Sequence, residues 1–174
     1  MFTHLDVKTE YSRIKGIMSC SELITEVKNK NQEAIAITDF THLSGIYEFY
    51  KECKSNGIKP IIGQEFCWCA DTQIIKPDSV GYDYYPIVLI AKNNNGLHNL
   101  IKLSTISWTD HLIPDEKSPV PRIDNTLLSQ YSDDLICLTG GEFGFLSLAI
   151  SKGFNNLAIQ WLNKLKNIFE SNLW

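Results

Sequence analysis

Apolar residues gather in short continuous runs along this chain, and the runs alternate with longer stretches in which they recur at helical spacing. Residues 34–38, 87–91 and 135–138 are nearly all apolar, as is typical of strands buried on both faces of a sheet. Residues 60–66 predict another strand, and an imperfect alternation of apolar positions predicts a short first strand over residues 2–8. We therefore expect five strands separated by helices.

Helical spacing and capping residues predict the elements between the strands. A capping box from Ser19 to Glu22 begins one helix. A second helix is predicted over Leu43–Ser55 and ended by Asn56 and Gly57. The predicted buried stripe of this second helix consists of Ile46, Phe49, Tyr50 and Cys53. Further helices are predicted over residues 93–104, 125–130, 145–151 and 155–169, and irregular connections over residues 70–84 and 108–122.

The alternation of strands and helices is typical of βαβ units, so it predicts an α/β fold with a parallel sheet. Periodicity alone does not distinguish an open sheet from a barrel. With 174 residues, the chain is long enough for one domain with a sizeable core. It ends just after a helix, where the next strand is expected, which indicates a portion of a longer protein.

Composition narrows the function classes. The net charge of −4 and a pI near 5.5 argue against a free-standing nucleic-acid-binding domain. No apolar run is long enough to span a bilayer, and the N-terminus has no signal-peptide pattern. Five cysteines at irregular spacing do not suggest a disulfide framework, and Cys67 and Cys69 are interpreted as small buried residues. We expect a reduced, cytoplasmic protein without a membrane partner.

Two carboxylates follow predicted strands, and they indicate where a site would lie. Asp39 comes directly after the strand over residues 34–38, and Glu65 comes near the end of the strand over residues 60–66. The carboxyl ends of parallel strands are where α/β folds build their sites. No serine or cysteine has the setting of a nucleophile, so no catalytic residue is predicted.

Six segments, in order, carry a resemblance to a known family. The chain resembles the N-terminal polymerase-and-histidinol-phosphatase (PHP) domain of the bacterial replicative DNA polymerase III alpha subunit. The resemblance covers residues 1–174 and implies a distorted seven-stranded β/α barrel, here as an incomplete N-terminal portion lacking the rest of the domain and the polymerase domains. The segments are HLDVKTEYSRIKG (4–16), AIAITDFTHLSGIYEFY (34–50), GIKPIIGQEF (57–66), PIVLIAKNNNGLHNLIKL (86–103), PRIDNTLLSQYSDDLICLTGG (121–141) and FESNLW (169–174).

Active members of this family hold several metal ions at the strand ends and hydrolyse phosphoesters, so the resemblance implies particular ligand positions. Glu65 supplies the glutamate ligand that the resemblance implies, and Asp39 is the aspartate of the implied Thr-Asp-His motif. Asp6 replaces a histidine with another possible ligand. The remaining expected ligand positions carry residues that do not bind a metal: Lys8, Lys15, Phe40, Pro86 and Gly141. We interpret these eight positions as vestigial and expect no metal and no cofactor.

The two lysines among these positions suggest an electrostatic substitute for the metal. Lys8 and Lys15 would place ammonium groups where cations bind in active members, near Asp6, Asp39 and Glu65. One hypothesis is an ion-pair network that keeps these carboxylates charged. The alternative is that both lysines point to solvent. His4 shares a face with Asp6 if residues 2–8 form a regular strand, so a place for it near the strand ends stays open.

The resemblance therefore implies a structural and interaction module within a DNA-directed DNA polymerase, a nucleotidyltransferase of DNA replication. Its expected partners are the rest of the alpha chain and the proofreading exonuclease subunit, with DNA reached only through the holoenzyme. The alternative is a metal-dependent phosphoesterase or exonuclease that uses Asp6, Asp39 and Glu65. An incomplete barrel would leave an open sheet edge, so we expect self-association through this edge or its coverage by the last helix.

Overall fold

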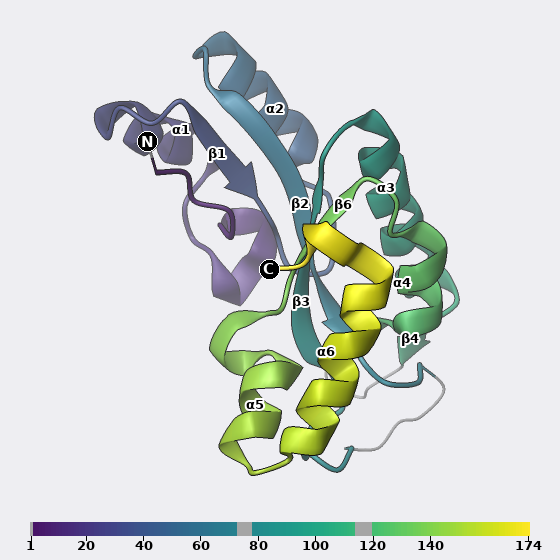
Figure 1. The fold of residues 1–174 in the computed structure, drawn as a ribbon. Coiled ribbons are helices and arrows are strands. Elements are labelled where there is room, and N and C mark those ends of the chain that lie inside the picture. The colour runs from purple at the N-terminus through teal and green to yellow at the C-terminus, as the bar shows by residue number, and fades with distance from the viewer. Residues whose placement is uncertain (1, 73–77, 114–119) are drawn as a thin grey trace. The chain divides into compact units, whose positions relative to one another are not determined.

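The computed structural model describes residues 2–72, 78–113 and 120–174 (Figure 1). The chain divides into two compact units, residues 1–65 and 66–174. The mixed α/β fold class expected from the sequence is confirmed, and parts of the predicted loops, residues 73–77 and 114–119, lie outside the described residues. No helix in the described ranges combines the length and the apolar character needed to cross a membrane.

The first unit is built from two helices and two strands. It contains the 3₁₀ helix η1 (Glu10–Lys15), α1 (Cys20–Asn29), β1 (Ala34–Ile37), α2 (Ile46–Ser55) and the first part of β2 (Lys59–Trp68). Strand β1 pairs with β2 in parallel, with Ala34 opposite Lys59 and Ile37 opposite Ile62. The βα units predicted for this region are therefore present.

Capping residues set the start of α1 as predicted. The Ser19 side chain accepts a hydrogen bond from the Glu22 backbone N–H, and the Glu22 carboxylate accepts one from the Ser19 backbone N–H. The hydrogen bonds from the Ser19 backbone and side chain lower the pKa of Glu22. A carboxylate in the first turn also interacts favourably with the helix dipole.

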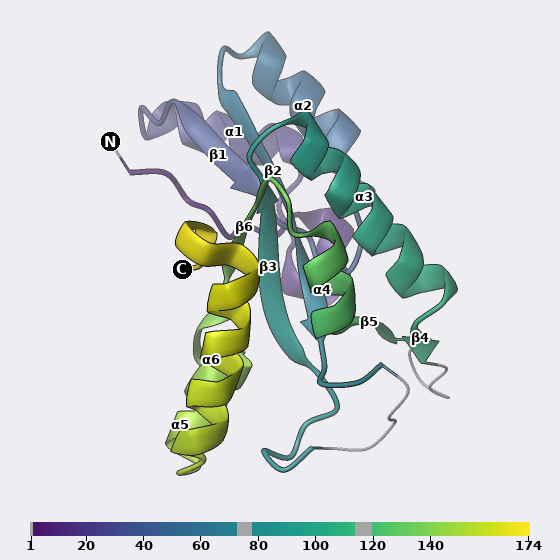
Figure 2. The ribbon, with the colours of Figure 1, turned by 45° about the vertical axis from the view of Figure 1, so that its right-hand side comes forward.

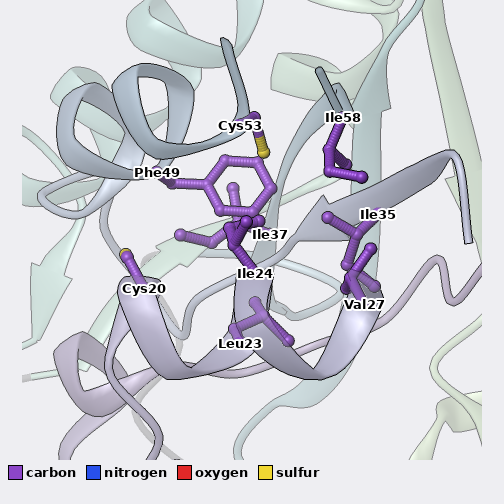
Figure 3. Close-up of a cluster of buried hydrophobic side chains, with 9 residues drawn as sticks. All are labelled: Cys20, Leu23, Ile24, Val27, Ile35, Ile37, Phe49, Cys53 and Ile58. Carbon is purple, nitrogen blue, oxygen red and sulfur yellow. The ribbon is translucent and has the colours of Figure 1, made fainter. Parts of the chain in front are cut away.

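An apolar core fills the space between α1, β1 and α2 (Figure 3). Fully buried side chains come from all three elements, with Ile24 on α1, Ile37 on β1 and Phe49 on α2. We use the name apolar core for the whole cluster, which comprises Cys20, Leu23, Ile24, Val27, Ile35, Ile37, Phe49, Cys53 and Ile58.

Three predictions for the first unit are wrong in detail. Helix α2 begins at Ile46 rather than Leu43, because Thr41 has a left-handed backbone and Gly45 forms the N-cap. Tyr50, expected in the buried stripe, is 48% exposed and lies beneath the Lys54 ammonium. Residues 2–8, predicted as the first strand, form no strand and bend at Leu5.

The second unit combines strands with two pairs of helices (Figure 2). Its helices are α3 (Asn94–Thr109) with α4 (Asn125–Tyr131), and α5 (Phe145–Ser151) with α6 (Asn155–Phe169), and the members of each pair pack on one another. Its strands are the end of β2, then β3 (Tyr85–Ala91), β4 (Leu112–Ile113), β5 (Val120–Ile123) and β6 (Leu135–Leu138). Short 3₁₀ helices follow at η2 (Gly141–Phe143) and η3 (Glu170–Asn172).

Strand directions in the second unit differ from the predicted all-parallel sheet. Strand β2 pairs with β5 in parallel, but β3 and β6 are antiparallel, with Val88 opposite Leu138 and Ala91 opposite Leu135. Strands β4 and β5 are also antiparallel. Buried strands are apolar in either direction, so the hydrophobic pattern could not reveal this difference.

The prediction of one irregular connection over residues 108–122 is also wrong. Trp108 belongs to the last turn of α3, and Val120–Ile123 forms strand β5. In the second unit, the backbone N–H of Trp174 donates to Cys137 O at 2.8 Å, and Thr139 N–H donates to Trp174 O at 2.9 Å. The final residues, rather than the last helix, therefore pair along β6, and self-association stays a prediction.

Candidate functional site

The backbone brings Asp39 and Glu65 together in the first unit. The parallel pairing of β1 and β2 continues beyond Ile37 as a bridge between Phe40 and Glu65. The backbone N–H of Glu65 donates to Asp39 O at 3.1 Å, and Thr41 N–H donates to Glu65 O at 2.8 Å. Asp39 follows β1 as predicted, whereas Glu65 lies inside β2, because that strand runs on to Trp68 and pairs there with β5.

The N-terminal segment lies beside the end of β1 and brings Asp6 and Lys8 there. Val7 N–H donates to Thr38 Oγ1 at 2.9 Å, and Thr38 N–H donates to Val7 O at 2.9 Å. Thr38 Oγ1 in turn donates to Asp6 Oδ1 at 2.6 Å. Thr38, which the sequence did not single out, therefore joins the N-terminal segment to the end of β1.

Two ammonium groups surround the Glu65 carboxylate. Lys8 Nζ lies 2.8 Å from Oε2, and Lys15 Nζ lies 2.5 Å from Oε1. Lys8 also pairs with Asp6. We call Asp6, Lys8, Lys15 and Glu65 the lysine–carboxylate cluster. Its two positive and two negative groups balance, so it needs no further cation for neutrality.

Burial differs between the two lysines. The Lys8 side chain is 13% exposed and that of Glu65 is 8% exposed, whereas the Lys15 side chain is 44% exposed. The ion pairs expected at Asp6 and Glu65 are present, and the solvent-facing alternative is wrong for Lys8. That these pairs keep the carboxylates charged stays a hypothesis. Exposed ion pairs contribute little because water screens them, so Lys8 is expected to matter more than Lys15.

Phe40, at a position where the resemblance implies a histidine, contacts the same cluster. Lys15 Nζ lies 3.7 Å from the centroid of the Phe40 ring. A cation over an aromatic face is attracted by the negative potential of the ring. Phe40 therefore has no metal-binding group and supplies a surface on which the Lys15 ammonium group rests.

Asp39 is held by neutral donors rather than by lysines. Its Oδ1 accepts hydrogen bonds from Thr9 N–H at 2.7 Å and Ser12 Oγ at 2.5 Å, and its Oδ2 accepts one from Thr9 Oγ1 at 2.7 Å. Asp39 is only 2% exposed. The hypothesis that a lysine pairs with this carboxylate is wrong within the described part of the chain, because both lysine ammonium groups pair with Glu65 and Lys8 also with Asp6.

Glycine at position 16 is required by the loop that positions Lys15. A Cβ atom at this position would lie 2.3 Å from the carbonyl oxygen of Thr9. The loop is closed by a hydrogen bond from Glu10 N–H to Met18 O at 2.9 Å. Thr9, Ser12 and Gly16 were not predicted as site residues. Threonine, serine and glycine are too common in the sequence to identify these three residues.

The remaining vestigial positions lie in the second unit. Pro86 is in β3, and Gly141 begins η2. A Cβ atom at Gly140 would lie 2.0 Å from the Pro86 carbonyl oxygen, so the turn before η2 packs directly on Pro86. Neither side chain carries a metal-binding group, and their placement relative to the first unit is not assigned.

The donor set in the first unit does not fit the metal centre of the active family. Within residues 2–72, 78–113 and 120–174, no three His, Cys, Asp or Glu side chains are grouped so that they could hold an ion. Asp6 and Glu65 face ammonium groups, which repel a cation. The role of His4 was left open by the sequence. Its ring packs edge-to-face against the Phe2 ring, with 4.7 Å between the two centroids.

The cysteines of the first unit show no sign of nucleophilic activation. Cys20 and Cys53 are buried in the apolar core. Burial raises the pKa of each thiol to about 12, with the charge of Glu48 adding to the effect at Cys20 and that of Glu52 at Cys53. A thiol with such a pKa stays protonated at neutral pH and is a poor nucleophile.

Comparisons with known proteins agree with the resemblance seen in the sequence. The family model described as PHP domain matches residues 4–173. The DNA polymerase III subunit alpha of Aquifex aeolicus (strain VF5) is 33% identical over 179 residues, which cover 99% of this chain and 15% of that protein. The corresponding subunit of Borreliella burgdorferi is 36% identical over 168 residues, covering 94% of this chain and 14% of that protein.

Among solved structures, the chain is similar to a "two-domain protein containing predicted PHP-like metal-dependent phosphoesterase" from Bacteroides vulgatus. The TM-score is 0.46 with 13% identity, and the match covers 93% of this chain and 48% of that one. The curated relatives named above are far longer, since the chain spans 14–15% of their length. The resemblance to the N-terminal domain of the polymerase alpha subunit is thereby confirmed.

Proposed function

Because the chain belongs to the PHP domain family, we propose that it is a metal-free, non-catalytic PHP domain of a replicative DNA polymerase III alpha subunit. In this role it acts in the cytoplasm as a scaffold within the longer polymerase chain. It also provides a docking surface for the proofreading exonuclease subunit. The polymerase reaction itself belongs to the parts of the relatives that this chain does not cover.

The position of Glu65 between Lys8 and Lys15 is the observation that carries this proposal. A metal centre needs ionised carboxylates with free lone pairs directed at the cation. Here Glu65 gives one oxygen to each ammonium group. A metal at this place would have to displace both ammonium groups and then remain close to their charges.

The neighbouring carboxylate supports the same conclusion. Asp39 accepts three hydrogen bonds from Thr9 and Ser12. Those donors satisfy its charge without a cation, as expected for a buried carboxylate with a structural role. The alternative is a metal-dependent phosphoesterase that uses Asp6, Asp39 and Glu65. It would require each of these carboxylates to give up the lysine or hydroxyl partners that it has here.

Elemental analysis of the purified, unchelated protein is the first test. We expect less than stoichiometric zinc, manganese or iron after expression in metal-supplemented medium. We also expect no metal-stimulated hydrolysis of bis(p-nitrophenyl) phosphate. One or more metal ions bound per chain, with hydrolysis abolished by a chelator, would establish the phosphoesterase alternative instead.

A charge-removal variant makes the metal test more specific. The double variant Lys8→Met with Lys15→Met removes both ammonium groups and leaves Asp6 and Glu65 in place. If the lysines replace the metal charge, this variant should bind a divalent cation more tightly than the unmodified chain. The measurement is a calorimetric titration with Mn²⁺, and Lys54→Met serves as control because Lys54 lies on α2 beside Tyr50.

The docking role requires a separate test, because it rests on the family resemblance alone. The purified proofreading exonuclease subunit from the same organism should bind this chain in a calorimetric or size-exclusion experiment. Exposed apolar side chains of the first unit, such as Ile17 at 94% exposure, are sites for charge-introducing variants that should weaken such binding. Absence of binding would leave the metal-free proposal intact and remove the docking role.

A further inference from the structure

The second unit contains a cleft that has not yet been described. It has a volume of about 220 Å³ and is open on one side. Its walls come from the end of β2, the segment before β3, α4 and the α5–α6 pair. None of its lining residues belongs to the vestigial metal-site positions.

Aromatic rings form the inner wall of the cleft. The centroid of the Trp68 ring lies 5.3 Å from those of Phe145 and Trp161, and the Phe145 and Trp161 centroids are 5.4 Å apart. All three rings are largely buried, and they pack edge-to-face or tilted. Such a wall offers a rigid apolar surface to a flat group.

The two indole N–H groups of this wall differ in their hydrogen bonding. Trp161 Nε1 is buried and has no hydrogen-bond partner in the described part of the chain. Trp68 Nε1 donates to Asn125 Oδ1 at 3.1 Å, which occupies the acceptor end of that amide and leaves its NH₂ group for another partner. An unsatisfied buried donor is unfavourable, so an acceptor that reached Trp161 Nε1 would remove that cost.

The lining of the cleft contains one cation and one carboxylate. Lys164 lines the cleft, is exposed, and makes no ion pair among the described residues. The one carboxylate of the lining, Asp78, already accepts hydrogen bonds from Val80 N–H, Gly81 N–H and the Tyr85 hydroxyl. Neutral donors therefore engage its Oδ1 while its charge remains, and Lys164 forms no ion pair with it among the described residues.

The size of the cleft limits what it can hold. Sites for drug-sized ligands usually measure about 300–1,000 Å³, and this cleft is smaller. It suits a single aromatic group with a short polar extension. We propose that the cleft between Trp68, Phe145, Trp161 and Lys164 binds an aromatic carboxylate, with the ring on the aromatic wall and the carboxylate at Lys164 and Asn125.

Ligand titration of the 174-residue chain tests this proposal. The probe is N-acetyl-phenylalanine, and its neutral match is N-acetyl-phenylalaninamide. Binding is followed by tryptophan fluorescence and by ligand-detected NMR. We expect millimolar binding of the acid and binding of the amide weaker by about fivefold or more, as for the loss of one charge-assisted contact. Equal binding of the two probes, or no binding of the acid, would overturn the proposal.

Two lysines on the same helix provide a matched pair of variants. Lys164→Gln removes the cation at the cleft, whereas Lys166→Gln removes an exposed cation of α6 that does not line it. We expect Lys164→Gln to weaken binding of the acid about fivefold and to leave the amide unchanged. Lys166→Gln should leave both unchanged. Equal loss in the two variants would show a general charge effect and contradict the proposed site.

Tryptophan 161 offers a second, independent readout. Trp161→Phe keeps an aromatic ring and removes only the indole N–H donor. Weaker binding of the acid in this variant, with an unchanged melting temperature, would support a direct role of that donor. Unchanged binding would exclude Trp161 Nε1 from the site. The Lys164 result would then decide the proposal alone.

The same chemistry is offered by two sources, a free aromatic acid and the C-terminal residue of a peptide. The tetrapeptide Gly-Gly-Ser-Phe, with a free or an amidated C-terminus, distinguishes them. Binding of the free-acid peptide equal to or tighter than that of N-acetyl-phenylalanine would identify a peptide C-terminus as the ligand class. Binding of N-acetyl-phenylalanine alone would identify a small free acid.

Discussion

The first unit contains two buried regions that meet at β1 and are held together in different ways. In the apolar core, Ile35 and Ile37 contact side chains of α1 and α2 through non-directional packing. The second region, called the polar region below, consists of the lysine–carboxylate cluster and of Asp39 with its donors Thr9 and Ser12. Each of its contacts joins two particular atoms, as between Lys8 Nζ and Glu65 Oε2. A core of this kind tolerates exchange among side chains of similar volume, whereas removing one ion leaves its partner buried and uncompensated.

Phe49→Ala should produce the largest effect, because it opens a cavity in the apolar core. Phe49 is fully buried on α2, and replacing a buried phenylalanine by alanine costs about 3–5 kcal/mol. Urea unfolding followed by circular dichroism measures the free energy of unfolding. Tyr47→Ala on the same helix is the control, since Tyr47 is 77% exposed; equal losses in the two variants would show that the core does not depend on Phe49.

Asp39→Ala should come next, because it removes the acceptor of three hydrogen bonds at the edge of the polar region. Three donor groups of Thr9 and Ser12 would lose their partner, at a cost of about 2–4 kcal/mol. Glu33→Ala is the control, since Glu33 is an exposed carboxylate of the first unit that makes no ion pair among the described residues. Urea unfolding would contradict the structural role of Asp39 if both variants lost equally little stability.

These two regions also differ in how far the sequence could predict them. Most of the apolar core follows from periodicity, since the capping box, the apolar run of residues 34–38 and the stripe ending in Cys53 all contribute to it. Tyr50 is the exception, because helical spacing predicts which positions share a face but not where that face stops being covered. Helices α5 and α6 were likewise predicted with the correct bounds.

The polar region could be located only in part. Asp39 and Glu65 were predicted as neighbours, because parallel strands bring their carboxyl ends to one edge. The partners of these carboxylates depend on three-dimensional register, which sequence spacing does not encode. Thr9 and Ser12 are 30 and 27 residues from Asp39, and hydroxyl side chains are too frequent to reveal such pairs. The antiparallel direction of β6 was missed for a related reason, since buried strands look alike in either direction.

Lys8→Met and Lys15→Met should separate buried from exposed ion pairs within the cluster. Loss of Lys8, which is 13% exposed, should lower the free energy of unfolding by about 1–3 kcal/mol. Loss of Lys15, which is 44% exposed, should lower it by about 0–1 kcal/mol. Urea unfolding of both variants at equal ionic strength measures the difference, and no loss of stability in Lys8→Met would disprove the network.

A double-mutant cycle makes this test more specific. Combining Lys8→Met with Glu65→Gln removes both charges of one pair, so the two losses should be less than additive. Additive losses would mean that Lys8 stabilises the unit through its aliphatic stem rather than through its charge. Lys15 serves as the internal reference of this cycle. Its ammonium group still lies beside residue 65 after Glu65 has been replaced by glutamine.

Tyr11 should show the smallest effect, and it tests how far the polar region extends. Its hydroxyl donates a hydrogen bond to Glu48 Oε2 at 2.7 Å. This hydrogen bond and the Glu48 charge raise the pKa of Tyr11 from 10.0 to about 12. Because the folded-state pKa is the higher one, the contact stabilises the fold fully below pH 10.0 and is lost as the pH rises toward about 12.

Ultraviolet difference titration of the unmodified chain against Tyr11→Phe isolates this phenol from the other tyrosines. Glu48→Gln keeps a hydrogen-bond acceptor and removes the charge, so it should return the pKa of Tyr11 part of the way to its ordinary value. If the pKa is unchanged in Glu48→Gln, the carboxylate does not interact with Tyr11 in solution. The polar region would then end at Ser12 and Asp39, and α2 would contribute to the first unit through the apolar core alone.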